Sequence, residues 1–187
     1  KADIRPARYE NKRLRARPRR ITVDASPMKM ELLPARTRAK LYRDAIQICN
    51  YELGMGVRDD YIKDQIKDDT NQVFLARNAD GTIVSYLLID ETYTDPSYPS
   101  MKVAEVNLIC AQRGGGLKLL SQAIRHYRAA GYDMIRLEAV RSATEAYKRA
   151  KFKAIGFTKK EGLVIMIYPL SDRVTMTRHG ARIKEAA

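Results

Sequence analysis

The sequence has no tryptophan, only two cysteines and two histidines, and no long apolar run. Neither Cys49 nor Cys110 has a second cysteine or a histidine at ligand spacing, so we expect no metal site. His126 and His179 have no serine or cysteine partner, which argues against a catalytic triad. The longest apolar run near the C-terminus, Leu163 to Tyr168, is six residues long, well short of the ~20 that a membrane-spanning helix needs.

The rest of the composition is typical of one globular domain, with 187 residues of which 45% are hydrophobic and 30% charged. No leader-like segment of charged, apolar and small residues opens the chain. Two cysteines without a disulfide framework are interpreted as buried free thiols. We therefore expect an intracellular protein in a reducing compartment.

Positive charge is concentrated at the N-terminus of a chain whose net charge is +13: residues 1–20 hold nine Lys or Arg against Asp3 and Glu10. Residues 1–27 have no apolar periodicity and cannot bury enough surface to fold alone. We expect a basic extended arm that contacts nucleic acid or neighbouring subunits of a large assembly, such as a virion or a ribonucleoprotein particle. A solvated tail is the alternative. Residues 171–187 are interpreted as a shorter basic C-terminal tail.

Residues 28–170 predict one α/β domain with a mixed central sheet and about four helices. The expected elements are strand 28–33, helices 35–53 and 58–68, strands 72–77, 82–92 and 102–110, helix 117–130, strand 133–140, helix 142–155 and strand 162–170. Because a helix connects strands 102–110 and 133–140, these two strands should be parallel neighbours with a right-handed crossover.

Three local signals refine this pattern. Asn78 to Gly81 is expected to form a hairpin turn. Ser142 and Glu145 have the spacing of a capping box at the start of helix 142–155. The loop 93–100 contains two prolines and is expected to be exposed.

Three glycines open helix 117–130, in the run Gln112-Arg-Gly-Gly-Gly-Leu-Lys118. Glycine lets main-chain N–H groups approach an anion without a Cβ in the way, and the first-turn N–H groups of a helix have no intrahelical partner. Arg113 and Lys118 add two cations. The run predicts a pyrophosphate-binding site; a flexible glycine turn is the alternative.

The run Gly114-Gly-Gly116-Leu-Lys118-Leu-Leu120 resembles the acetyl-CoA motif of the GNAT (GCN5-related N-acetyltransferase) superfamily, as do the element order over most of residues 28–170 and Gly156-Phe157 before the last strand. The resemblance implies that the strand before the loop splays from its parallel neighbour and admits the pantetheine arm of acetyl-CoA. It also implies that Leu108, Ile109 and Cys110 offer main-chain groups to pantetheine, and that the pyrophosphate is held by Gln112, Arg113, Gly114, Gly115, Gly116, Leu117 and Lys118.

Two positions depart from the family pattern. The usual arginine or glutamine, counted back from the glycines, falls on Ala111. The family often has a tyrosine four residues before the glycine of the Gly-Phe pair, whose hydroxyl protonates the leaving thiolate. Counted from Gly156, that position is Phe152. Tyr147 lies five residues earlier on the same predicted helix, about 140° away around its axis. The usual proton donor is therefore expected to be missing.

Glu105 is the candidate general base. It lies mid-strand on the alternating face of Val103, Glu105, Asn107 and Ile109, where the family sometimes carries a catalytic glutamate. A carboxylate there can take a proton from a substrate amine directly or through water. A solvated strand glutamate is the alternative.

Two functions are consistent with these features. The first is transfer of an acetyl group from acetyl-CoA to a primary amine, in a site shaped by the loop 93–100 and the helices within 35–68. The second is a non-catalytic structural component with a GNAT-like fold, built into a virion or ribonucleoprotein particle and anchored by its basic arm.

Overall fold

The computed structural model describes residues 30–32, 41, 48, 59–111, 115–159, 162–177 and 180–184. The predictions for the basic arm, residues 1–27, and for Gln112, Arg113 and Gly114 lie outside these ranges. Of the helix predicted over 35–53, the structure describes Leu41 and Ile48, which are both helical and buried.

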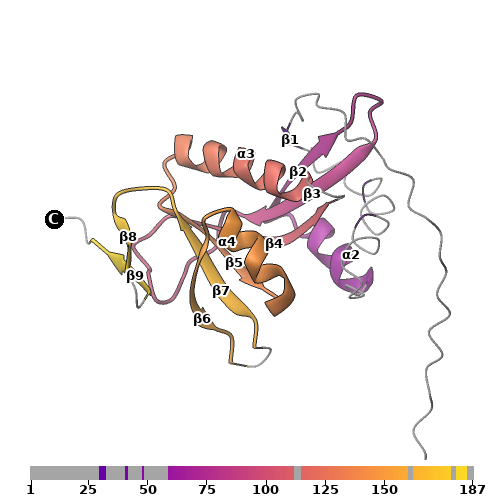
Figure 1. The fold of residues 1–187 in the computed structure, drawn as a ribbon. Helices are drawn as coiled ribbons and strands as arrows, with labels where there is room; N and C mark the ends of the chain where they lie inside the picture. Colours follow the sequence, from indigo (N-terminus) through magenta and orange to yellow (C-terminus); the bar gives the residue numbers. More distant parts are fainter. Residues whose placement is uncertain are drawn as a thin grey trace, which may run out of the picture.

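A seven-stranded sheet forms the centre of the molecule, with its strands in the order β1-β2-β3-β4-β5-β7-β6 (Figure 1). β4 and β5 are parallel, and every other described pair in this sheet is antiparallel. The predicted mixed sheet and its parallel pair are therefore confirmed. The strands are β1 (Met30–Leu32), β2 (Asn71–Arg77), β3 (Ile83–Asp90), β4 (Val103–Ala111), β5 (Met134–Ala139), β6 (Lys153–Phe157) and β7 (Val164–Pro169).

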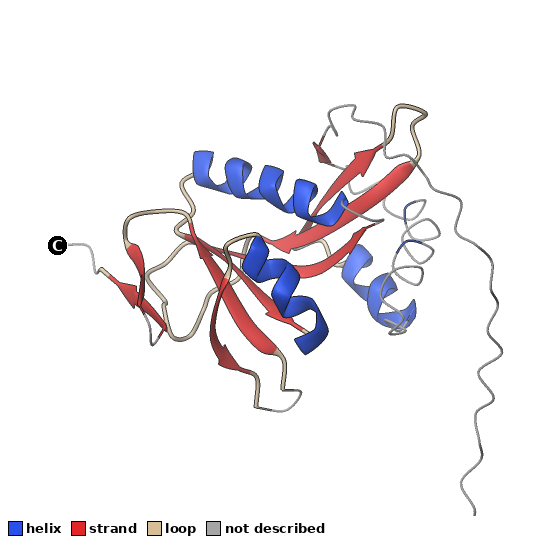
Figure 2. Cartoon of the chain, in the orientation of Figure 1, coloured by secondary structure: helices blue, strands red, loops and turns tan. Residues whose placement is uncertain are grey.

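Helices cover both faces of the sheet (Figure 2). On one face, α3 (Gly115–Ala129) buries an apolar stripe against β2, β3, β4 and β5, and α4 (Thr144–Arg149) packs on the same core through Tyr147. On the other face, α2 (Asp59–Lys67) buries Ile62 and Ile66 in a second core. Both helices with clear apolar periodicity, α2 and α3, form as predicted, because a stripe at 3.6-residue spacing can be buried only by a helix on the sheet.

The connection between β2 and β3 is the predicted hairpin turn. Gly81 has a φ of 85°, and its N–H donates to the carbonyl of Asn78 over 2.9 Å. The side chain of Asp80 accepts a hydrogen bond from the N–H of Thr82 over 2.9 Å.

The region after β5 differs from the prediction. The helix expected over 142–155 is wrong: a 3₁₀ turn (Arg141–Ala143) leads into α4, which ends at Arg149, and β6 then pairs with β7. The capping box is also wrong, since Ala143 caps α4 without a side-chain hydrogen bond. Glu145 instead forms an ion pair with Lys148 over 2.7 Å.

The segment interpreted as a C-terminal tail contains an unpredicted hairpin of β8 (Val174–Thr177) and β9 (Gly180–Ile183). Val174 is buried in a small cluster with Met101, Met134 and Ile167, which ties this hairpin to the sheet. No helix in the described ranges is long and apolar enough to cross a membrane.

Candidate active site

The two parallel strands separate partway along their length. β4 pairs with β5 from Val103↔Met134 to Val106↔Leu137, and no pairing with β5 is described for the remaining β4 residues, 107–111. On its other edge, β4 stays paired with β3 up to Ala111. The region where the carboxyl ends of β4 and β5 have no described pairing is called the gap below, and Figure 1 shows β4 ending near the start of α3.

A β-bulge lies where this separation begins. In the β3–β4 ladder Leu88 pairs with Leu108 while Ile89 pairs with Val106, so Asn107 is the extra residue. The bulge reverses which side chains face which side: Leu108 and Cys110 enter the core with α2, whereas Ile109 packs against the core under α3. The prediction that Val103, Glu105, Asn107 and Ile109 share one face of the strand is therefore wrong, because it assumed that side chains alternate without interruption along β4.

Hydrogen bonds to two neighbouring elements hold the bulge. The Tyr61 hydroxyl of α2 donates to the carbonyl oxygen of Asn107 over 3.1 Å. The Asn107 amide donates to Asn71 Oδ1 over 2.7 Å, and Asn71, fully buried, donates to the Gln65 carbonyl over 3.0 Å. Sequence reasoning missed this network because it joins residues of α2, β2 and β4 that are far apart in the chain.

The start of α3 lies directly against the sheet. A Cβ on Gly116 would come within 3.1 Å of the Ala111 Cβ, and one on Gly115 within 3.5 Å of Ser85. Glycine at 116 therefore lets α3 begin immediately beside the end of β4. Among the described residues, no side chain accepts a hydrogen bond from the first-turn N–H groups of residues 115–117. These amides remain available to an anion.

The described part of the loop has the charge and the donor groups of an anion site. The first turn of α3 has no acidic residue, and Lys118 is exposed there. The Ser85 hydroxyl, fully buried beneath Gly115, has no hydrogen-bond partner among the described residues. The structure thus brings Gly115, Gly116, Leu117 and Lys118 to the same end of the gap as Leu108, Ile109 and Cys110.

Glu105 lies just before the gap and is paired with a buried arginine. Arg136, its direct neighbour on β5, forms an ion pair with it; their side chains are 8% and 14% exposed, respectively. Arg136 also contacts Glu138 over 2.8 Å and Asp95 over 3.4 Å, and the Tyr93 ring lies 5.1 Å from its guanidinium. The solvated alternative for Glu105 is therefore wrong. The loop 93–100 is mostly exposed, as predicted, but its Asp95 is buried against Arg136.

The surroundings of Glu105 raise the pKa of its carboxyl group toward neutral pH. Burial raises the pKa of Glu105 to about 7; the Arg136 charge opposes this shift, and the nearby carboxylates Glu138 and Asp90 add to it. A carboxyl group with that pKa can both accept and release a proton at physiological pH, as a general base must.

Tyr147 is a proton-donor candidate that the sequence reasoning misplaced. α4 ends at Arg149, and Lys151, with a φ of 72°, takes the left-handed position that follows a helix end. Tyr147 then lies four residues before that position, and Phe152, buried at 2% exposure, is the aromatic residue that follows. The helical position predicted for Phe152 is wrong, because Phe152 follows the end of α4 and Gly156 lies within β6.

The environment of Tyr147 keeps its hydroxyl protonated. The side chain is partly buried, and its ring packs 5.9 Å from the Phe152 ring. Burial raises its pKa to about 12. No hydrogen bond from this hydroxyl is found within the described part of the chain. Tyr147 therefore carries a hydroxyl that stays protonated at neutral pH and retains its capacity to donate.

Cys110 is buried and disulfide-bonded. The expectation of two free thiols is therefore wrong, and a single cysteine in a strand gives no sequence signal of its bonding state. The chain's other cysteine, Cys49, lies outside the described residues. Within those residues no group of three or more His, Cys, Asp or Glu side chains could hold a metal ion.

Comparison with known proteins identifies the fold. No family model and no curated protein matches the sequence, but many solved structures match the fold. GCN5 from Tetrahymena superposes with a TM-score of 0.62 at 15% identity, covering 77% of this chain and 96% of that one. A GNAT-family acetyltransferase from Listeria monocytogenes has a TM-score of 0.59 at 16% identity, covering 76% and 94%.

A third structure was solved with a ligand. The GNAT-family N-acetyltransferase YhbS from Escherichia coli, in complex with CoA, has a TM-score of 0.60 at 11% identity and covers 78% of this chain and 83% of that one. At such identities the likeness establishes the architecture. This chain therefore has the GNAT fold, and its parallel β4–β5 pair agrees with the sequence prediction.

Proposed function

We propose that this chain transfers an acetyl group from acetyl-CoA to a primary amine. The proposal rests above all on the gap between β4 and β5, which opens after Val106↔Leu137 beside the uncapped first turn of α3. The CoA complex of a protein with the same fold supports this choice of acetyl donor.

The gap would bind the donor along β4. Main-chain groups of Leu108, Ile109 and Cys110 would hold pantetheine, since β4 has lost its β5 partner there. The diphosphate would lie on the amides of Gly115, Gly116 and Leu117 beside Lys118, with Gln112, Arg113 and Gly114 expected to complete the loop. Bound in this way, acetyl-CoA supplies the acetyl group as an activated thioester.

Two side chains would move the protons. Glu105 would accept the proton that the amine loses as the new C–N bond forms, directly or through water. Tyr147 would donate its proton to the sulfur as the C–S bond breaks. Arg136 would hold the Glu105 carboxyl group in place without contacting the acceptor. The products are an acetylated amine and CoA.

Calorimetric titration of acetyl-CoA into the full chain tests the proposal first, and micromolar binding is expected. Lys118→Gln should weaken this binding several-fold because Lys118 lies in the first turn of α3. The matched variant Arg182→Gln, which removes an exposed cation of β9, should not. Release of CoA in the presence of a panel of primary amines then tests turnover. Absence of acetyl-CoA binding would contradict the proposal.

The second candidate is a non-catalytic GNAT-fold component of a virion or ribonucleoprotein particle. The concentration of basic residues in 1–27 and the ion pair that engages Glu105 favour it. Under this alternative, no amine in the panel would be acetylated, and the protein would copurify with its assembly.

A further inference from the structure

A basic pocket lies on the face of the sheet that carries α3 and α4, away from the gap. It has a volume of about 350 Å³ and lies between α3, the end of α4 and β7. Four cationic side chains line it, together with the ring of Tyr168 and no carboxylate. They are Arg125 and Arg128 of α3, and Arg149 and Lys151 at the end of α4.

The four cations have no acidic partner. All four are exposed, and within the described residues none of them forms an ion pair or a side-chain hydrogen bond. The nearest acid on α4, Glu145, forms its ion pair with Lys148 instead, although Arg149 also acts on its charge. Mutual repulsion among four cations around one small pocket is unfavourable unless an anion binds there.

One wall of the pocket is partly fixed in place. The Arg128 guanidinium lies 5.9 Å from the centre of the Tyr168 ring. Lys151 has a φ of 72°, a conformation in which lysine is strained and glycine is not. A glycine there would end α4 at lower conformational cost, so the lysine side chain is kept at the expense of stability.

Two arginines of the pocket lie far from the first turn of α3, where the donor's diphosphate is proposed to bind. Arg125 lies ten residues along α3 from Gly115, which is ~15 Å at the rise of an α-helix, and Arg128 is farther still. A diphosphate on the first turn of α3 would not lie within contact distance of these two arginines.

We propose that this pocket binds the phosphate backbone of a nucleic-acid strand. Arginine presents a planar fork of donors that matches a phosphate, and a row of such contacts follows a backbone without reading its sequence. The strongly basic N-terminal segment of the same chain adds a long-range attraction for the same polyanion. The pocket would fix the strand relative to α3 and α4.

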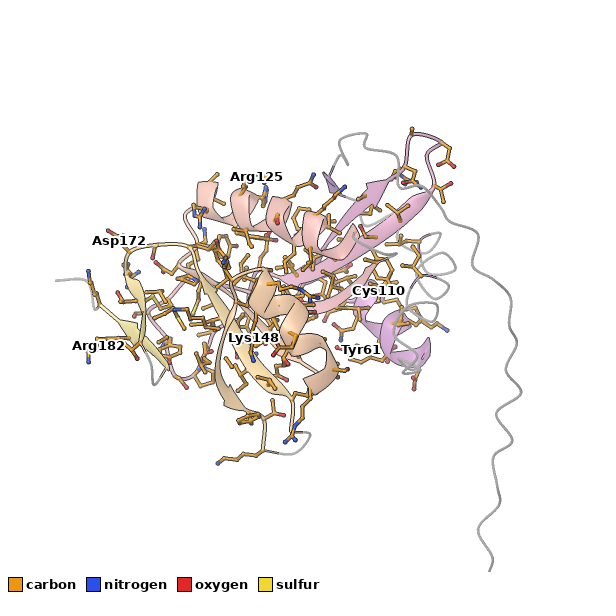
Figure 3. All side chains as sticks on the ribbon, viewed as in Figure 1. Tyr61, Cys110, Arg125, Lys148, Asp172 and Arg182 are labelled. Atoms are coloured by element: carbon orange, nitrogen blue, oxygen red, sulfur yellow. The ribbon has the colours of Figure 1, made fainter. Side chains whose placement is uncertain are left out.

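Binding of a fluorescently labelled single-stranded oligonucleotide to the full chain, followed by anisotropy over a range of salt concentrations, tests the proposal. The pocket variant is Arg125→Gln with Arg149→Gln. The control is Arg182→Gln, in β9, with Lys184→Gln just after it, which removes the same charge; Figure 3 shows Arg182 at the opposite end of the molecule from Cys110 and on another element than Arg125 of α3. Both variants keep the N-terminal basic residues, so the contribution of those residues cancels.

The slope of log K against log salt should become shallower by about 1.4 in the pocket variant, since each lost single-strand phosphate contact contributes about 0.7. The control should keep a slope close to that of the unaltered chain. Equal slopes in the two variants would overturn the proposal, because they would indicate a general charge effect. Acetyl-CoA binding should be the same in all three proteins, which separates this result from the proposed enzymatic function.

Three further measurements complete the test. Lys151→Gly should weaken oligonucleotide binding while raising the melting temperature, a combination that misfolding cannot produce. Polyglutamate of matched charge should fail to displace the oligonucleotide; displacement would indicate an acidic protein partner and overturn the proposal. Displacement by CoA would overturn it as well, because the pocket would then belong to the coenzyme.

Discussion

The two faces of the sheet differ in how their positively charged side chains are paired with carboxylates. On the face away from α3, Arg136 is buried and meets three carboxylates, so its charge is neutralised within the fold. On the α3–α4 face, the pocket around Arg125 and Arg149 holds four exposed cations without a carboxylate. A buried charge must be paired because desolvation is expensive, whereas exposed cations need no partner for folding. The first cluster therefore stabilises the fold and the proposed base, and the second is available to a ligand.

Removing Arg136 should produce the largest effect on stability. Arg136→Met would leave Glu105, Glu138 and Asp95 without their counter-ion, and the free energy of unfolding at neutral pH should fall by ~3–5 kcal/mol. Urea denaturation measures this loss. The control is Arg173→Met, whose ion pair with Asp133 is one-third exposed on the arginine side and should matter far less. Equal losses in the two variants would mean that the Arg136 cluster behaves as a surface ion pair.

Glu105 should link activity and stability to pH with opposite signs. Burial raises its pKa to about 7 in the folded chain, from an ordinary value of 4.5, so between these values the folded chain binds more protons than the unfolded one. The contribution of Glu105 to stability is therefore complete below pH 4.5 and falls as pH rises through 7. The value of kcat/KM should instead rise over the same interval, because the carboxylate is the base.

The variant Glu105→Gln separates these two effects. It should lower kcat by roughly 100- to 1000-fold, the range expected for loss of a general base, and remove the rise of kcat/KM near pH 7. The corresponding pH dependence of the free energy of unfolding should disappear as well. An unchanged pH–rate profile would assign the base to another residue.

Tyr147 should affect turnover with little change in stability. Tyr147→Phe keeps the ring that packs beside Phe152 and removes only the hydroxyl. We expect kcat to fall about 100-fold while KM for acetyl-CoA stays constant. Tyr132→Phe, also on the α3 side of the core, is the control and should retain full turnover. A normal kcat in the Tyr147 variant would leave the thiolate to be protonated by solvent.

Local sequence patterns predicted the scaffold of the site. The stripe of Leu120, Ala123 and Tyr127 predicted α3, and its position between two apolar strands predicted the parallel β4–β5 pair. These signals are contained within a few helical turns or one strand. For the same reason the glycine-rich start of α3 could be predicted from sequence alone.

The features that the sequence did not predict depend on contacts between distant residues. The bulge at Asn107 depends on the register between β3 and β4. It places the Ile109 side chain on the face of the sheet opposite to the one that unbroken alternation predicts. The pairing of Glu105 with Arg136 depends on strands 31 residues apart in the chain. The end of α4 was missed because Lys151 adopts the conformation that usually marks glycine. The role proposed for Tyr147 could be considered only once that helix end was known.

The smallest effect should come from the basic pocket, and it sharpens the comparison between the two faces. Arg125→Gln with Arg149→Gln removes two exposed cations that have no ion pair in the described residues, so the free energy of unfolding should change by less than about 0.5 kcal/mol. Relief of repulsion around the pocket could make that change slightly positive. Urea denaturation of this variant and of Arg136→Met under the same conditions compares the free energy of unfolding that the two clusters contribute. A loss of several kcal/mol in the pocket variant would show that these cations hold the fold together and are not reserved for a ligand.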